Sequence, residues 1–182
     1  AEFMGSALYI VHSDAIIRNN HFHHNLNSAT IGIDASAVKF INNLIEQNHS
    51  TNSGGILFLR NRSDSVNAVI INNTIANNIC AQGAVIPYGS STSFINNIIY
   101  GNEPSQVYFN VTSSVGFYNC LIEGGQEGFT GEAFTGAYEN CIDADPQFMS
   151  SNDYHLQNTS PCIGAAIDSI QIGASWFYCS PT

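Results

Sequence analysis

The residue types that could do acid–base or metal chemistry gather in two short segments of this chain. His21, His23 and His24 stand almost side by side, and Glu46 follows His23 by 23 residues. An imidazole beside a carboxylate can act as a general acid and base. On a strand His21 and His23 point the same way, but no third ligand accompanies them at a fixed spacing, as a metal ion requires. We therefore predict no metal centre here.

A segment that repeats around a pair of asparagines decides whether His23 and Glu46 meet. Its copies are Ile16-Ile17-Arg18-Asn19-Asn20, Phe40-Ile41-Asn42-Asn43, Ile70-Ile71-Asn72-Asn73, Phe94-Ile95-Asn96-Asn97 and Phe117-Tyr118-Asn119-Cys120. Equivalent residues of successive copies are separated by 23, 30, 24 and 23 residues, a period typical of stacked supersecondary units. Apolar residues alternate on either side of each pair, which indicates strands broken by a corner. The sequence predicts an all-β solenoid, a parallel β-helix of about six coils spaced by about 4.8 Å.

The asparagines have a structural reason to recur. A backbone that leaves the sheet at a corner still needs hydrogen-bond partners, and a carboxamide offers both donors and acceptors. The second members of the pairs are predicted to stack as a ladder at one corner, namely Asn20, Asn43, Asn73 and Asn97, with Cys120 at its end. The same alignment predicts two inward stacks, Ile17, Phe40, Ile70, Phe94, Phe117 and Phe22, Ile45, Ile75, Ile99, Ile122.

A third sheet is expected before each corner. Its strands are predicted at Leu8 to Val11, Ile31 to Asp34, Ile56 to Leu59, Ala84 to Pro87 and Val107 to Val111. In this register Tyr9, Leu57 and Tyr108 point outward, and Tyr88 and Tyr100 add aromatic groups elsewhere. Sugars stack on exposed aromatic rings and bond to amides and carboxylates, so these five residues are the predicted glycan contacts. The alternative is that they lie under loops or under the C-terminal segment.

Composition limits the partners. The chain has 14 acidic and 4 basic residues, a formal net charge of −10. No cluster of Lys and Arg is available to neutralise phosphates, so nucleic acid is excluded as a partner. No apolar run reaches the length of about 18 residues needed for a transmembrane segment.

The chain is predicted to divide into three parts. Residues 1–6 resemble a cloning scar, residues 7–142 form the coils, and residues 143–182 form a closing segment of the same domain. Recognisable solenoid begins near Leu8 without a cap over its core. We therefore expect a C-terminal fragment of a longer protein, whose first coil offers a surface for end-to-end association.

Cysteines are concentrated in the second half. Cys120 and Cys141 stand in matching contexts 21 residues apart, so they occupy one corner of successive coils, close enough for a disulfide. Cys162 and Cys179 are predicted to tie the final segment to itself, which leaves Cys80 as a free thiol. Such bridges suit an exported protein.

The closing segment carries a resemblance to a known group of proteins. It reads Asp143-Ala144-Asp145-Pro146-Gln147-Phe148, Asp153-Tyr154-His155-Leu156-Gln157, Ser160-Pro161-Cys162-Ile163-Gly164-Ala165 and Ile172-Gly173-Ala174. It resembles the C-terminal closing motif of exported bacterial right-handed parallel β-helix proteins of the pectate-lyase-like superfamily, with Gln171 in place of that group's usual Asp. The resemblance implies the fold, a secreted or cell-surface location and association with polysaccharides. It implies no reaction, since β-helices host lyases, hydrolases, adhesins and stalks.

The resemblance also suggests where catalysis would lie. Lyases of the superfamily use Arg or Lys as base and commonly Ca²⁺ held by clustered carboxylates. Arg60, Arg62 and Asp64 share an insertion at residues 60–67, and insertions in a solenoid often form the binding face, but no obvious stack of carboxylates accompanies them. No cofactor is expected, with Ca²⁺ as the alternative for a lyase.

Hydrolases need two carboxylates about 5 to 9.5 Å apart. Glu46 and Glu123 occur in one outward row three coils apart, about 14 Å by the strand spacing, which is too far. His23 and Glu46 would be neighbours on adjacent coils and could form an acid/base couple. We predict a polysaccharide-binding module without chemistry of its own, with a lyase or glycosidase fragment and a structural or adhesive spacer as the alternatives.

Overall fold

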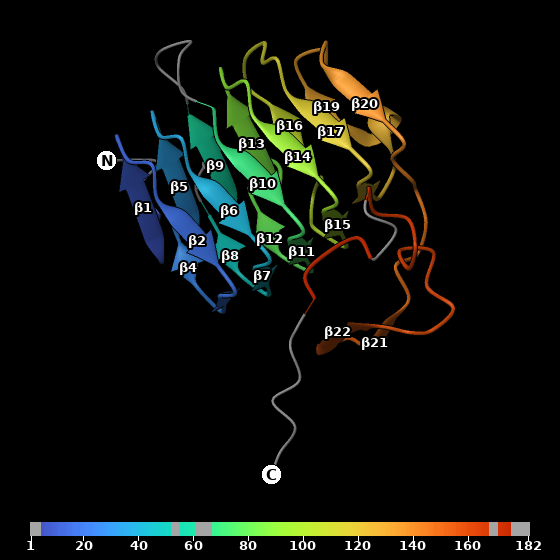
Figure 1. Cartoon of the computed structure of the whole chain (residues 1–182). Helices are drawn as coiled ribbons and strands as arrows, with labels where there is room; N and C mark the ends of the chain where they lie inside the picture. The colour runs from blue at the N-terminus through green and yellow to red at the C-terminus, as the bar shows by residue number, and fades with distance from the viewer. Residues whose placement is uncertain (1–4, 52–54, 61–66, 168–170, 176–182) are drawn as a thin grey trace.

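The computed structural model describes residues 5–51, 55–60, 67–167 and 171–175, which form a parallel β-helix with a closing segment at its side (Figure 1). Consecutive coils pair in parallel, strand over strand, as predicted. Arg62, Asp64, Cys179 and most of the predicted scar, residues 1–4, lie outside the described residues.

Three sheets make the walls of the coils. The first sheet contains β1 (Leu8–Val11), β5 (Ile31–Asp34), β9 (Leu57–Arg60) and β13 (Val85–Tyr88). The second contains β2 (Ile16–Arg18), β6 (Lys39–Ile41), β10 (Val69–Ile71), β14 (Ser93–Ile95), β17 (Gly116–Tyr118) and β20 (Ala137–Glu139). The third contains β3 (His21–His23), β7 (Leu44–Glu46), β11 (Thr74–Ala76), β15 (Ile98–Tyr100) and β18 (Leu121–Ile122).

Shorter elements complete the chain. A small sheet contains β4 (Leu26–Asn27), β8 (His49–Ser50) and β12 (Ile79–Cys80). The strands β16 (Tyr108–Phe109) and β19 (Thr130–Gly131) pair beside the single-turn 3₁₀ helix η1 (Gln126–Gly128), and β21 (Phe148–Ser150) and β22 (Asp153–Leu156) form an antiparallel hairpin. Among the described residues, no helix has the length and apolar character needed to cross a membrane.

The two asparagines of each pair have different structural roles at the corner between the second and third sheets. The first member adopts the left-handed conformation in every coil, for example with φ of 54° at Asn42 and 53° at Asn72, a region that asparagine enters more readily than most residues. From Asn43 onward the second member turns inward and is buried, whereas Asn20 in the first coil is exposed. The Nδ2 atom of Asn43 donates to Oδ1 of Asn73 at 3.0 Å, so the predicted ladder is confirmed, and Cys120 ends it by accepting from the Asn97 backbone N–H at 3.4 Å.

A second asparagine ladder stands five residues after the first. It runs through Asn25, Asn48, Asn78 and Asn102 and ends on Gln106, with side-chain contacts of 2.6–3.0 Å. The sequence signalled it, since an asparagine follows four of the five repeats at this distance. It closes the corner between the third sheet and the small sheet.

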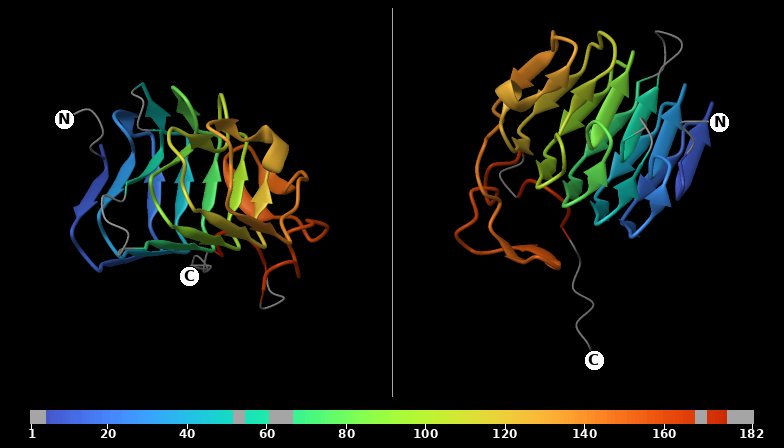
Figure 2. Two further views of the ribbon diagram at one scale, coloured as in Figure 1. Left: turned by 90° about the horizontal axis from the view of Figure 1, so that it is seen from above. Right: turned by 180° about the vertical axis from the view of Figure 1, so that it is seen from behind.

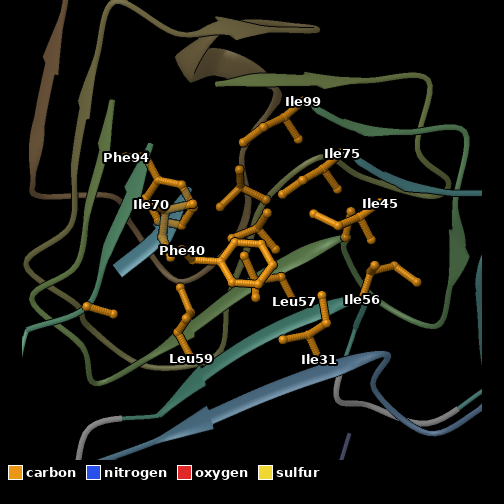
Figure 3. Packing of buried hydrophobic residues seen from close by; sticks show 14 of the residues in the cluster. Ile31, Phe40, Ile45, Ile56, Leu57, Leu59, Ile70, Ile75, Phe94 and Ile99 are labelled. Carbon is orange, nitrogen blue, oxygen red and sulfur yellow. The ribbon is translucent and has the colours of Figure 1, made fainter. Parts of the chain in front are cut away.

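The core fills the space between the sheets. Register pairs Ile70 with Phe40 on one side and Phe94 on the other. It pairs Ile75 in the same way with Ile45 and Ile99, so both predicted inward stacks are confirmed (Figure 3). Phe94 and Phe117 stack with ring centroids 4.9 Å apart. In the first coil the equivalent residues, Ile17 and Phe22, are only partly buried. End-to-end association through this coil stays a prediction.

The predicted outward position of Leu57 is wrong. Leu57 aligns with Ile31 and Val85 and is fully buried in the core. β9 and β13 each begin one residue later than expected, and a shift of one residue moves a side chain to the other face of a sheet. Phe58 takes the outward position instead, in register with Ile86.

The predicted disulfide between Cys120 and Cys141 is also wrong. Both are free thiols stacked at one corner, where the Cys120 backbone N–H donates to Sγ of Cys141 at 3.4 Å. They replace asparagines at the end of the first ladder. Cys162 is a buried free thiol as well, and its predicted partner Cys179 lies outside the described residues.

The closing segment turns back along the coils instead of adding to them. Figure 2 shows it leaving the last coil and lying beside the solenoid. Its last described residues run antiparallel to the direction of stacking. Gly173 donates to the Asn96 carbonyl, Ala174 to the Thr74 hydroxyl, and Ser175 to the Asn42 side chain, each one coil nearer the N-terminus.

Candidate functional site

A cavity lies between the outer face of the third sheet and the hairpin β21–β22. It has a volume of about 200 Å³ and is lined by His21, Leu44, Glu46, Asn152, Asp153, Tyr154 and His155. The hairpin is held there because Tyr154 packs on Leu44 and Ala76. The cavity therefore forms between segments that are about 110 residues apart in sequence, such as Glu46 and Tyr154 (108 residues).

Glu46 is the most buried titratable group in this cavity, with 5% of its surface exposed. Its Oε1 lies 2.8 Å from Nε2 of His21, and its Oε2 accepts from the Tyr154 hydroxyl at 3.4 Å. The Tyr154 oxygen in turn accepts from Nδ2 of Asn77 at 3.0 Å. A buried carboxylate is costly unless hydrogen-bonded, so these contacts stabilise Glu46 and fix its orientation.

The histidines meet Glu46 because of strand alternation and coil stacking. His21 and His23 lie two residues apart on β3 and face outward together, with ring centroids 4.3 Å apart. Register places His23 opposite Glu46, as predicted, but His21 makes the hydrogen bond. One ligand atom from each of the three residues lies within 4.8 Å of the other two. An acid/base couple at this place would therefore consist of His21 and Glu46.

A second histidine–carboxylate pair lines the same cavity. Nδ1 of His155 lies 2.5 Å from Oδ1 of Asp153, which also accepts from the His155 backbone N–H at 3.0 Å. Donation from the backbone N–H, and then from the ring, lowers the pKa of Asp153. Both side chains are more than two fifths exposed, so the pair stands at the mouth of the cavity.

The outer face of the first sheet gathers most of the predicted glycan contacts. Tyr9 lies across Gly32 of the next coil, where an added Cβ would come within 2.7 Å of its ring. Its hydroxyl donates to Oδ2 of Asp34 at 3.2 Å, and Nη2 of Arg60 bonds to the same oxygen. Asp34, Arg60 and Tyr88 are in register on successive coils.

Phe58 and Tyr108 add two further aromatic rings to the outer face of the first sheet. The Phe58 and Tyr88 rings lie 6.1 Å apart, and Tyr88 and Tyr108 pack against the buried pair of Phe58 and Ile86. Tyr9, Tyr88 and Tyr108 each keep part of their surface exposed. We call Tyr9, Asp34, Arg60, Tyr88 and Tyr108 the tyrosine face.

Arg60 is poorly suited to act as a base. Its hydrogen bond to Asp34 raises the pKa of the guanidinium above its ordinary value, and a base must first lose its proton. Burial opposes this effect but does not outweigh it.

Tyr100 is placed away from the tyrosine face. It projects from the third sheet, where its ring meets Phe148 edge to face at 6.4 Å. The closing segment covers part of it, which agrees with the alternative interpretation of this residue. Burial and the nearby carboxylates, Asp145 first, raise its pKa.

The contacts of three residues in these sites were not predicted from the sequence. Asp34 was expected in a strand but not as a partner of Arg60, because the register of β9 was shifted. His21 was considered for metal binding but not as the partner of Glu46. Tyr154 lies in the recognised Tyr-His-Leu strand, yet its docking on Glu46 had no signal in the repeat.

Comparison with known proteins identifies the fold family. The family described as right handed beta helix region matches residues 6–153. No curated protein and no solved structure matches the chain significantly.

Proposed function

Because the chain belongs to the right-handed β-helix family, we propose that it is an exported or cell-surface module that binds a polysaccharide along the tyrosine face. The proposal rests on one observation: partly exposed tyrosines flank a hydrogen-bonded Asp34–Arg60 pair across successive coils of one sheet. Sugar rings stack on aromatic faces, and their hydroxyls bond to groups such as carboxylate and guanidinium.

The extent of the face suits an extended chain. Tyr9 and Tyr108 stand four coil intervals apart in the first sheet and its continuation, about 19 Å at the usual strand spacing. A polysaccharide lying along the solenoid axis can therefore contact several coils at once.

The charge of the protein favours a neutral polysaccharide. With a formal net charge of −10, the molecule repels anionic chains at low salt. The export proposal is supported by the closing motif and not by the cysteines, since Cys120 and Cys141 are unbridged.

Affinity electrophoresis tests the proposal. A neutral glycan in the gel is expected to retard the protein, and Tyr9→Ala and Tyr88→Ala should each reduce that retardation several-fold. Tyr118→Ala removes a half-buried tyrosine from the second sheet and is the matched control. The rates of unsaturated uronate formation and of glycan hydrolysis should stay at background, with or without Ca²⁺.

Three outcomes contradict the proposal. An accumulating uronate product that Arg60→Ala abolishes would identify a lyase. Hydrolysis of the glycan would identify a glycosidase. If no glycan retards the protein, the structural or adhesive spacer is the better description.

A further inference from the structure

Two histidines and one glutamate on adjacent coils bring three metal-ligating groups to one point on the third sheet. Their donor atoms all lie within 4.8 Å of one another. We propose that His21, His23 and Glu46 form a binding site for one divalent cation of the zinc class. The site is separate from the tyrosine face, which lies on the first sheet, so neither proposal depends on the other.

The donor set selects the class of ion. Two imidazole nitrogens with one carboxylate oxygen suit Zn²⁺ and its first-row neighbours. Ca²⁺ and Mg²⁺ prefer ligands that are all oxygen, so they should bind here weakly.

One ligand distance is shorter than a bound ion needs, and the other two are at most 4.8 Å. Bonds of about 2.0–2.1 Å in a tetrahedral site put ligand atoms about 3.4 Å apart. Nε2 of His21 and Oε1 of Glu46 are now 2.8 Å apart and share a hydrogen bond. An ion replaces that proton and separates the two atoms by about 0.6 Å, a movement that small side-chain rotations can supply.

Neighbouring residues already orient the ligands. The hydroxyl of Tyr154 donates to the second oxygen of Glu46, leaving Oε1 directed at the histidines. Nδ1 of His23 lies 2.8 Å from Nδ1 of His24, so Nε2 of His23 remains for the ion. Metal-bound histidines are usually held in this way through their other ring nitrogen.

The site has room for a fourth ligand. The cavity of about 200 Å³ opens beside His21 and Glu46, and its far wall carries Asn152, Asp153 and His155. Three protein ligands with an open fourth position, occupied by water or by a small ligand, are typical of zinc sites that do chemistry.

Calorimetric titration with ZnCl₂ tests the site on the whole, tag-free chain after treatment with a chelator. One Zn²⁺ should bind per chain, and His23→Ala and Glu46→Gln should each weaken its affinity at least tenfold. Glu46→Gln keeps the shape of the side chain. The matched control is His49→Ala, which removes an exposed histidine outside the cluster.

Two further measurements distinguish the loss of a metal ligand from the unfolding of a variant. Circular dichroism and the unfolding midpoint without metal should show that both variants are folded. Zn²⁺ should also raise the unfolding midpoint of the unmodified protein, as any ligand of the native state does, and should not raise that of Glu46→Gln. The absence of Zn²⁺ binding, an equal loss in His49→Ala, or binding of Ca²⁺ as tight as that of Zn²⁺ would overturn the proposal.

Discussion

The carboxamide of Asn73 lies directly over that of Asn97, with Nδ2 of Asn73 3.0 Å from Oδ1 of Asn97. Asn73 Nδ2 also bonds to the carbonyls of Phe40 and Ile71 at 2.9 Å. Asn43 donates to Asn73 Oδ1 from its backbone N–H at 2.8 Å. One fully buried side chain thus satisfies backbone groups of two coils.

Replacing Asn73 by Leu is expected to lower the free energy of unfolding by about 1–3 kcal/mol, since buried polar groups lose their partners. Urea denaturation followed by circular dichroism measures it. The control is Asn158→Leu, an exposed asparagine of the closing segment, which should change stability by less than about 0.5 kcal/mol. Equal midpoints for Asn73→Leu and the unmodified protein would contradict the structural role of the ladder.

The sequence was sufficient for the second and third sheets because each coil carries its own marker there. An asparagine pair fixes the corner, and the residues on both sides then follow by alternation, which placed Phe40 over Ile17 and Ile45 over Phe22. The first sheet has no such marker. An insertion of about seven residues separates β9 from the next corner, so the register of β9 could not be counted back from that corner. For this reason Leu57 was assigned to the wrong face.

The candidate site was predictable only in part. Neighbouring coils brought His23 opposite Glu46, as the repeat required. The choice of His21 as hydrogen-bond partner depends on side-chain rotation, which spacing does not determine. Tyr154 reaches Glu46 from 108 residues away, through a segment that has left the repeat.

Removing the hydroxyl of Tyr154 tests how the hairpin is held. Tyr154→Phe keeps the packing on Leu44 and Ala76 but loses the bonds to Asn77 and Glu46. We expect a loss of about 1–2 kcal/mol in the free energy of unfolding, together with faster proteolysis at the turn between β21 and β22. Tyr118→Phe, at a half-buried position of the second sheet, is the matched control and should leave both measurements unchanged.

Counting the free thiols tests whether the cysteines are unbridged, as in the structure, or paired in the disulfides expected from the sequence. Cys80, Cys120, Cys141 and Cys162 are all free, so a thiol reagent should modify at least four cysteines in the denatured, unreduced protein. Modification of one cysteine would instead support both predicted bridges and contradict the stacked thiols at the corner.

Alkaline pH should destabilise the protein through buried groups that resist ionisation. Burial raises the pKa of Cys80 from 9.0 to about 12, that of Cys162 from 9.0 to about 11, and that of Tyr138 from 10.0 to about 12. These groups ionise in the unfolded chain first, so they stabilise the native state fully below pH 9 and lose that contribution as pH rises through the folded pKa.

The decline should begin near pH 9 and can be assigned to a residue. For Cys80 alone, the pH interval from 9.0 to 10.5 corresponds to about 2 kcal/mol. Denaturant titrations at pH 8 and pH 10.5 should therefore show a smaller fall for Cys80→Ala than for the unmodified protein, even though the variant is less stable at pH 8 because it leaves a small cavity. If both proteins lose the same free energy over this interval, Cys80 is not the buried thiol that the structure shows.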